Sequence, residues 1–170
     1  MPVTYDSIQS TTLSSTTGTI SFTSIPSTFT DLRLRLFVPN SVTANPSVRL
    51  RFNNDSGTNY NRLLLAVNNN SIYTGNANAA TDIHLAGEIN ISTTGPSQSF
   101  LIDIFSYASS SFKTLFIKEN QDRNASNGGY DNIVGMWRST AAISSLTLVC
   151  NGAGVFGVGT TATLFGIKSA

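Results

Sequence analysis

Apolar and polar residues alternate with a period of two in many segments of the chain. Residues 31–38 and 48–53 show this most clearly, because apolar side chains occupy every second position and the positions between them are polar except for Phe37. Such alternation puts one kind of side chain on each face of a β-strand. Both segments therefore predict half-buried strands, and both carry arginines on the polar face: Arg33, Arg35, Arg49 and Arg51.

Further strands are expected along most of the chain, and only residues 107–112 could hold a turn of helix. Residues 60–67 contain three consecutive leucines, which indicates burial on both faces of that strand. Other strands are expected at 99–107, 133–139, 143–149 and 160–168. About ten short strands with almost no helix predict an all-β fold, an antiparallel β-sandwich of jelly-roll type. Its expected core contains Leu34, Leu36, Leu50, Phe52, Ile102, Ile104, Trp137, Leu146, Leu148 and Leu164.

Two polar segments interrupt this pattern and are expected to be surface loops. Residues 68–80 are rich in Asn and Ala, and residues 119–132 read ENQDRNASNGGYDN. Exposed Tyr and Asn can form an adaptable recognition surface, with tyrosine rings as stacking platforms for sugars. The same composition also suits an ordinary loop. The candidate recognition residues are Tyr73, Asn76, Asn124, Asn127 and Tyr130.

Composition narrows the classes of function. The 170 residues suit a single domain, residues 1–170, and Ser, Thr and Asn together make up 61 of them while charged residues make up only 11%. Low charge suits the surface of an assembly subunit, because it protects a free monomer poorly against self-association. The net charge of +1 gives no reason to expect nucleic acid as a partner. The N-terminus lacks the features of a secretory signal and no apolar run is long enough to span a membrane, so we expect synthesis in a cytoplasm and no membrane contact.

Few residues could carry catalysis or bind a metal. His84 is the sole histidine and Cys150 the sole cysteine, and each sits in an apolar or alternating run that favours a structural role over a catalytic pair. Asp103 and Glu119 could face each other as a carboxylate dyad, although no motif supports it. Asp55 lies in an Asn- and Gly-rich segment that favours a tight turn over a calcium loop. We expect no catalytic residues, no metal and no cofactor.

The four arginines allow two interpretations. If their two strands pair, all four lie on one face of one sheet, where their stems can pack over apolar surface as an ordinary solvated face. The same face could instead contact the carboxylates or carbonyls of a partner, because arginine is enriched at protein interfaces. Both interpretations stay open at this point.

Several segments resemble a family of small β-sandwich virion proteins of tailed bacteriophages. The likeness spans nearly the whole chain and is carried by TYDSIQSTTLSSTTGTISFTSIP, TFTDLRLRLFV, SVRLRFNNDSGTNY, GMWRSTAAISSLTL and GVFGVGTTATLFGIKSA. The positions that match are framework positions: Phe22, Ile25, Pro26, Leu32, Asn53, Gly57, Tyr60, Trp137 and Gly166. They indicate a fold and a setting, but no particular binding site.

The resemblance implies a non-enzymatic virion structural protein, made in the cytoplasm of a bacterial host. The expected role is capsid decoration or cementing, as a homo-oligomer with a trimer favoured. The expected partners are other virion proteins, either the major capsid protein or tail and portal components. An alternative is a tail or fibre module that binds a host-surface glycan. An enzyme that hydrolyses host polysaccharide is a third reading.

Overall fold

The structure is a computed structural model that describes residues 4–39, 47–68, 71–85, 97–122, 128–151 and 154–168. Within these ranges it contains twelve β-strands and no helix, so the expected all-β class is confirmed. Residues 107–112, the best candidate for a turn of helix, form turns and bends. No helix in this part of the chain is long and apolar enough to cross a membrane.

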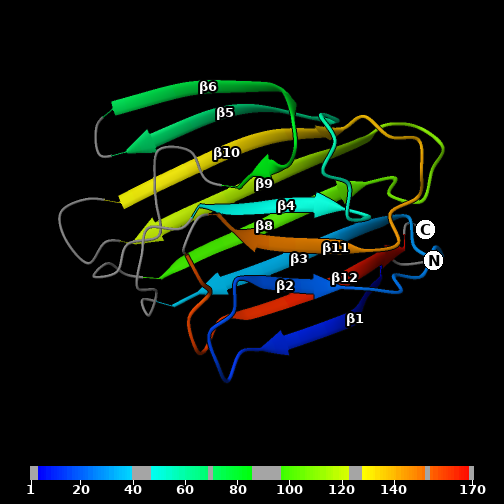
Figure 1. The fold of residues 1–170 in the computed structure, drawn as a ribbon, viewed down its shortest axis with the longest axis horizontal. Coiled ribbons are helices and arrows are strands. Elements are labelled where there is room, and N and C mark those ends of the chain that lie inside the picture. Colours follow the sequence, from blue (N-terminus) through cyan, green and yellow to red (C-terminus); the bar gives the residue numbers. More distant parts are fainter. Residues whose placement is uncertain are drawn as a thin grey trace.

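The strands form two antiparallel sheets that pack face to face as a sandwich (Figure 1). The order of the larger sheet is β1 (Thr4–Thr12), β12 (Thr161–Lys168), β3 (Asp31–Val38), β8 (Gln98–Phe105), β9 (Lys113–Asp122), β10 (Gly128–Trp137), β5 (Tyr60–Asn68) and β6 (Ser71–Ala80). The order of the smaller sheet is β2 (Thr19–Phe22), β11 (Leu146–Cys150), β4 (Val48–Phe52) and β7 (Ile83–His84).

Eight of these strands make a jelly roll. The order β1-β12-β3-β8 in the larger sheet matches β2-β11-β4-β7 in the smaller one, and the chain crosses between the sheets from β1 to β2, β3 to β4, β7 to β8 and β11 to β12. This alternation is the connectivity of two Greek keys. The other four strands form two hairpins, β5–β6 and β9–β10, that extend only the larger sheet. Figure 1 shows β6 as one edge of the widened sheet and β1 as the other.

The space between the sheets holds the core, and the alternating pattern identified it correctly. In β3 the even-numbered residues are buried and the odd-numbered ones are partly or fully exposed, and β4, β8 and β11 alternate in the same way. All ten residues expected in the core are at most 2% exposed. Period-two alternation was reliable because each of these strands has one face against the opposite sheet.

The outer face of the larger sheet is not covered by any described element, and this overturns one prediction. Leu63 and Leu65 were expected to be buried, but they are 62% and 47% exposed, whereas Leu64 between them is 7% exposed. β5 belongs to an added hairpin whose outward side chains meet solvent. A run of three leucines therefore marks an exposed apolar surface here.

Both segments expected to be loops contribute strands instead. Residues 71–80 form β6, which pairs with β5 from Asn68↔Ser71 to Tyr60↔Ala80. Residues 119–122 and 128–132 belong to β9 and β10, which pair with each other. Asn, Ala and Gly are poor strand formers, and cross-strand pairing overrode that preference.

Some polar side chains of the second segment, residues 119–132, point into the sandwich rather than toward solvent. Glu119 and Asp131 lie directly opposite each other on β9 and β10, and both are at most 1% exposed. Gln98 and Gln121 form the neighbouring cross-strand pair on β8 and β9, and they are equally buried. The inner face of the larger sheet therefore changes from apolar to polar toward this end of the sandwich, a change that sequence reasoning interpreted as a loop.

A carboxylate and three aromatic rings connect the two sheets at the other end of the core. The Asp55 carboxylate, in the turn between β4 and β5, accepts hydrogen bonds from Trp137 Nε1 at 2.7 Å, Asn59 Nδ2 at 2.9 Å and Gly57 N at 2.8 Å. The centre of the Trp137 ring on β10 lies 5.5 Å from that of the Phe52 ring on β4 and 6.4 Å from that of the Tyr60 ring on β5. The chain thus crosses from the smaller to the larger sheet around one fixed indole.

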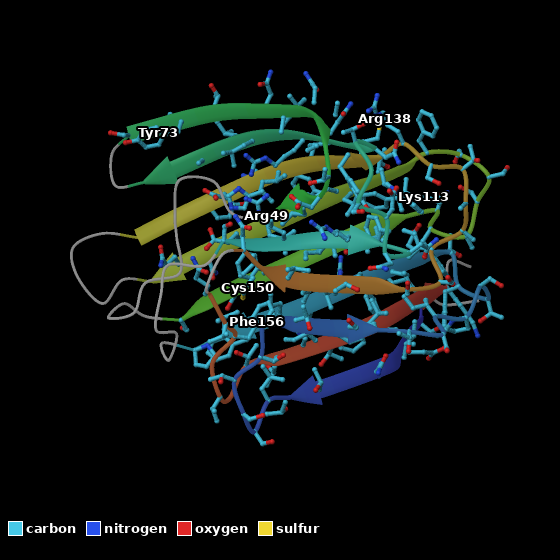
Figure 2. The ribbon with its side chains drawn as sticks, in the orientation of Figure 1. Arg49, Tyr73, Lys113, Arg138, Cys150 and Phe156 are labelled. Carbon is cyan, nitrogen blue, oxygen red and sulfur yellow. The ribbon has the colours of Figure 1, made fainter. Side chains whose placement is uncertain are left out.

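A buried lysine closes the same end of the core. Lys113, opposite Trp137 in the β9–β10 pair, places its Nζ 6.0 Å from the centre of the indole ring (Figure 2). The ammonium group donates to the carbonyl oxygens of Ser109 at 2.8 Å and Ser111 at 2.5 Å. Desolvation lowers the pKa of Lys113, and these carbonyls offset part of that cost.

Replacing Asp55 should destabilise the fold in a pH-dependent way. The indole hydrogen bond is the main cause that holds the pKa of Asp55 below its ordinary value, so its stabilisation is present above about pH 4 and is lost as the pH falls further. We expect Asp55→Ala to lower the free energy of unfolding by about 2 kcal/mol at pH 7, as for a hydrogen bond to a charged group. Denaturant unfolding at pH 7 and pH 3 measures this, with Ser56→Ala as the neighbouring control. An equal loss at both pH values would contradict this role of the carboxylate.

Candidate functional site

A groove of about 570 Å³ crosses the outer face of the larger sheet. Its bed is made of outward side chains from β12, β3, β8, β9 and β10, which the strand register arranges in two adjacent rows. One row contains Thr161, Phe37, Ser99, Asn120 and Tyr130, and the other contains Thr163, Arg35, Leu101 and Lys118. We call this surface the outer groove.

A second hollow of about 400 Å³ continues the outer groove toward β1. It shares Arg35, Leu101 and Phe165 with the first hollow and adds Tyr5 and Arg33. Together the two hollows run across most of the jelly-roll part of the sheet. Their size lies in the range of ordinary ligand sites, but they are open and shallow rather than enclosed.

The cations of the outer groove differ in their partners. Arg33 makes a bidentate pair with Asp103, with Nε to Oδ1 at 2.5 Å and Nη2 to Oδ2 at 2.9 Å. This pair raises the pKa of Arg33, and its Nη1 also donates to the hydroxyl group of Tyr5. Arg35 and Lys118 make no ion pair with any described carboxylate, and Lys118 Nζ lies 5.5 Å from the centre of the Phe116 ring. The outer groove therefore presents two positive charges that are not neutralised within the described chain.

Two exposed aromatic rings lie in the row next to these cations. Phe37 and Tyr130 are each 41% exposed, and the Tyr130 hydroxyl donates to Asn132 Oδ1 at 3.0 Å. They lie in one row but three strands apart, which is about 14 Å at the backbone for strands spaced by nearly 5 Å. Exposed rings with hydroxyl and amide side chains between them form a surface that is both apolar and rich in hydrogen-bonding groups.

The four arginines do not share one face, so that prediction was wrong. Arg33 and Arg35 project from β3 in the larger sheet, and Arg49 and Arg51 project from β4 in the smaller sheet. The two strands share one pattern because each has an inner face and an outer face. They lie in different sheets because the chain crosses between the sheets after β3. The two pairs lie on opposite outer surfaces of the sandwich.

Arg49 and Arg51 have a local partner on the smaller sheet. The buried carboxylate of Asp82 receives Arg49 Nη1 at 3.1 Å and Arg51 Nη2 at 3.2 Å. The two guanidinium groups carry like charges on the same face of one strand. The carboxylate between them offsets their repulsion. This surface is consequently less available to an outside anion than the outer groove is.

The candidate recognition residues separate as well. Tyr130 lines the outer groove, whereas Tyr73 and Asn76 lie on β6 at the far edge of the sheet (Figure 2 for Tyr73). Asn124 and Asn127 lie outside the described residues. The two tyrosines have the same exposed fraction, 41%, but only Tyr130 has cations and other rings beside it.

Neither of the two candidate catalytic pairs, Asp103 with Glu119 and His84 with Cys150, is formed in the structure. Asp103 faces outward to Arg33 while Glu119 faces the core, so the two carboxylates lie on opposite faces of one sheet. His84 is in register with the outward-facing Arg49, and Cys150 is in register with the inward-facing Val48. Burial raises the pKa of the Cys150 thiol to about 12, which favours the structural role expected for it.

Asp55 uses its carboxylate within the turn, as the tight-turn reading expected. Its oxygens accept the hydrogen bonds described above, and Asn53 and Asn54 next to it adopt positive φ values of 50° and 57°. Within the described ranges, no three His, Cys, Asp or Glu side chains come close enough to hold a metal ion.

An aliphatic patch that sequence reasoning missed adjoins the outer groove. Leu63 and Leu65 on β5, Val134 on β10 and Ile72 on β6 project outward at neighbouring positions, and each is 47–71% exposed. The leucine run was its one signal, but it was interpreted as buried. We call these four residues the aliphatic patch.

The strand beside this patch is an open edge. β6 pairs with β5 on one side, and no described strand pairs with its other side. Its sequence, SIYTGNANAA, contains no charged residue and no proline. Lysine and proline are the usual protection of an edge strand against pairing with another chain, and β6 has neither.

Comparison with known proteins finds no family model, no curated protein and no solved structure that matches this chain. The resemblance to phage virion proteins therefore remains a prediction.

Titration of His84, the single histidine, should contribute to the pH dependence of the free energy of unfolding. Burial, followed by the charges of Arg62 and Arg49, lowers the pKa of His84 to about 4. Between about pH 6.5 and pH 4 the unfolded chain binds a proton that the folded chain does not, so acidification should reduce the free energy of unfolding. We expect His84→Gln to remove this part of the pH dependence in denaturant titrations at pH 7 and pH 5. An NMR titration midpoint of the folded His84 ring near 6.5 would contradict the assignment.

Proposed function

We propose that this protein is a non-enzymatic structural subunit whose copies associate through β6 and the aliphatic patch. The observation that carries the proposal is the position of four exposed aliphatic side chains beside an edge strand that contains no charged residue and no proline. Each feature alone is an aggregation risk for a free monomer. Together they form one continuous surface that a second copy of the chain can cover.

Other copies of the chain can cover these features through two contacts, one at the strand edge and one at the sheet face. An antiparallel contact between two β6 strands continues the larger sheet from one copy into the next and pairs the free backbone groups of the edge. Strand pairing alone leaves the outward side chains of β5 and β10 in solvent, so the aliphatic patch is covered by packing against the patch of another copy. Neither β6 nor the patch contributes a charge that would have to be desolvated.

We further propose that the assembly is a bacteriophage virion and that the subunit decorates or cements the capsid. The resemblance over nearly the whole chain supports this setting, and the low fraction of charged residues supports a role as a subunit of an assembly. The partners are then the major capsid protein or tail and portal components. A two-fold contact through β6 gives a dimer, and packing of the patch around a three-fold axis gives the trimer that was favoured on the sequence.

Polar substitutions in the patch should yield a monomer. We expect Leu63→Ser combined with Leu65→Ser to reduce the mass in light scattering to 18.1 kDa, while the wild type shows two or three copies. Both side chains are exposed, so unfolding should change by less than about 1 kcal/mol. Phe112→Ser, at a residue that is 51% exposed outside the sheets, is the matched control and should leave the mass unchanged. A monomeric wild type would refute association through this surface.

The capsid role predicts a fixed stoichiometry. Mature heads purified from the phage that encodes this chain should contain the protein in a constant ratio to the major capsid protein, including heads that lack tails. The patch variant should bind such heads more weakly if oligomerisation contributes avidity. Absence of the protein from tail-free heads would exclude capsid decoration and leave the tail module as the virion role.

A further inference from the structure

We propose that the outer groove binds an oligosaccharide that carries carboxylate groups. This inference goes beyond the structural role, because the outer groove lies on β12, β3, β8, β9 and β10 and leaves the β6 edge free. Binding at the outer groove and association through β6 can therefore succeed or fail separately.

The charge of the outer groove calls for an anion. Arg35 and Lys118 lie in one row with Leu101 between them, about 10 Å apart at the backbone. No described carboxylate pairs with either of them, in contrast to Arg33, Arg49 and Arg51. A guanidinium group recognises a carboxylate through two parallel hydrogen bonds, which gives direction as well as charge.

The rest of the surface calls for a sugar. Phe37, Tyr130 and Phe165 offer apolar ring surface, Ser99 and Asn120 offer a hydroxyl and an amide group between Phe37 and Tyr130, and Thr161 offers a hydroxyl group beside Phe37. A sugar ring has an apolar C–H face and a rim of hydroxyl groups, so it matches both kinds of side chain. A fatty acid would leave these hydroxyl and amide groups without partners.

The dimensions call for more than one sugar unit. Phe37 and Tyr130 are three strands apart, and the two hollows share Arg35 and extend to Tyr5. One sugar ring cannot stack on both Phe37 and Tyr130. The ligand that uses the whole outer groove is therefore an extended chain lying across the strands.

Nucleic acid has a similar chemistry of rings and negative charge, but the surface fits it less well. A polynucleotide is held mainly by neutralisation of several phosphates. The outer groove offers two unneutralised cations, and the whole chain has a net charge of +1. Single-stranded DNA is accordingly a competitor to be tested.

Calorimetric titration of the full chain can test the proposal. The probes are oligosaccharides that contain uronic or sialic acid, the methyl esters of the same oligosaccharides, and single-stranded DNA of similar length. We expect binding of at least one acidic oligosaccharide, and binding at least about tenfold weaker for its methyl ester, because the ester removes the charge that Arg35 and Lys118 recognise. Higher salt should weaken binding of the acidic form.

Matched variants locate the binding surface. Arg35→Gln and Tyr130→Ala should each weaken binding at least about tenfold, since one removes the bidentate donor and the other a stacking ring. Lys168→Gln removes an exposed cation outside the outer groove, and Tyr73→Ala removes a tyrosine with the same 41% exposure, so both should bind as the wild type does. Circular dichroism of each variant confirms that it is folded.

Three results of the titrations would overturn the inference, and one further result with the variants would exclude the outer groove as its site. They are no binding of any acidic oligosaccharide by the folded wild type, equal affinity for acid and ester, and tighter binding of single-stranded DNA with the same dependence on Arg35. A loss of affinity in Tyr73→Ala equal to that in Tyr130→Ala would also exclude the outer groove. The patch variant Leu63→Ser with Leu65→Ser should retain binding, which separates this test from that of association.

Discussion

The hydrogen bond from the Trp137 indole to the Asp55 carboxylate links the two sheets at the point where the fold departs from a simple jelly roll. β4 ends in the smaller sheet and β5 begins in the larger one, and the turn between them is fixed by Asp55. The Tyr60 hydroxyl adds to this connection, because it receives the Phe52 amide at 3.0 Å and donates to the Asp55 carbonyl at 3.1 Å. The direction in which the β5–β6 hairpin leaves the sandwich depends on these contacts.

That hairpin and the β9–β10 hairpin make one sheet twice as wide as its partner. The jelly roll needs four strands in each layer, and the extra four strands supply the β6 edge, the aliphatic patch and part of the outer groove. Tyr130 and Lys118 come from β10 and β9, and the aliphatic patch comes from β10, β5 and β6. The framework positions that carry the family resemblance lie mostly in the jelly roll, whereas both proposed surfaces include strands that were added to it.

The sequence predicted the inner face well and the outer face poorly, for one physical reason. A position opposite the second sheet must be apolar, so Leu34, Leu50 and Ile102 were identified from alternation alone. A position on an uncovered face has no such requirement, and Leu63 and Leu65 were misread as core because apolar side chains usually are. The prediction for Glu119 was wrong in the opposite sense. A polar side chain on the inner face interrupts the alternation, so its segment was interpreted as a loop. The prediction of a common face for Arg33 and Arg49 was wrong because the topology of the chain decides which strands pair. The local alternation of residues carries no information about that topology.

The composition of β6 has a consequence for how the chain avoids aggregation while it folds. β5 contains three leucines in succession and would be the edge of the sheet if β6 were not in place. A strand with that sequence and free backbone groups is a template for cross-β stacking, and in the folded chain β6 occupies those groups and replaces the leucine-rich edge with a less apolar one. β6 therefore covers the most apolar strand of the added hairpins, and a chain in which β5 is not paired with β6 exposes that strand to misassembly.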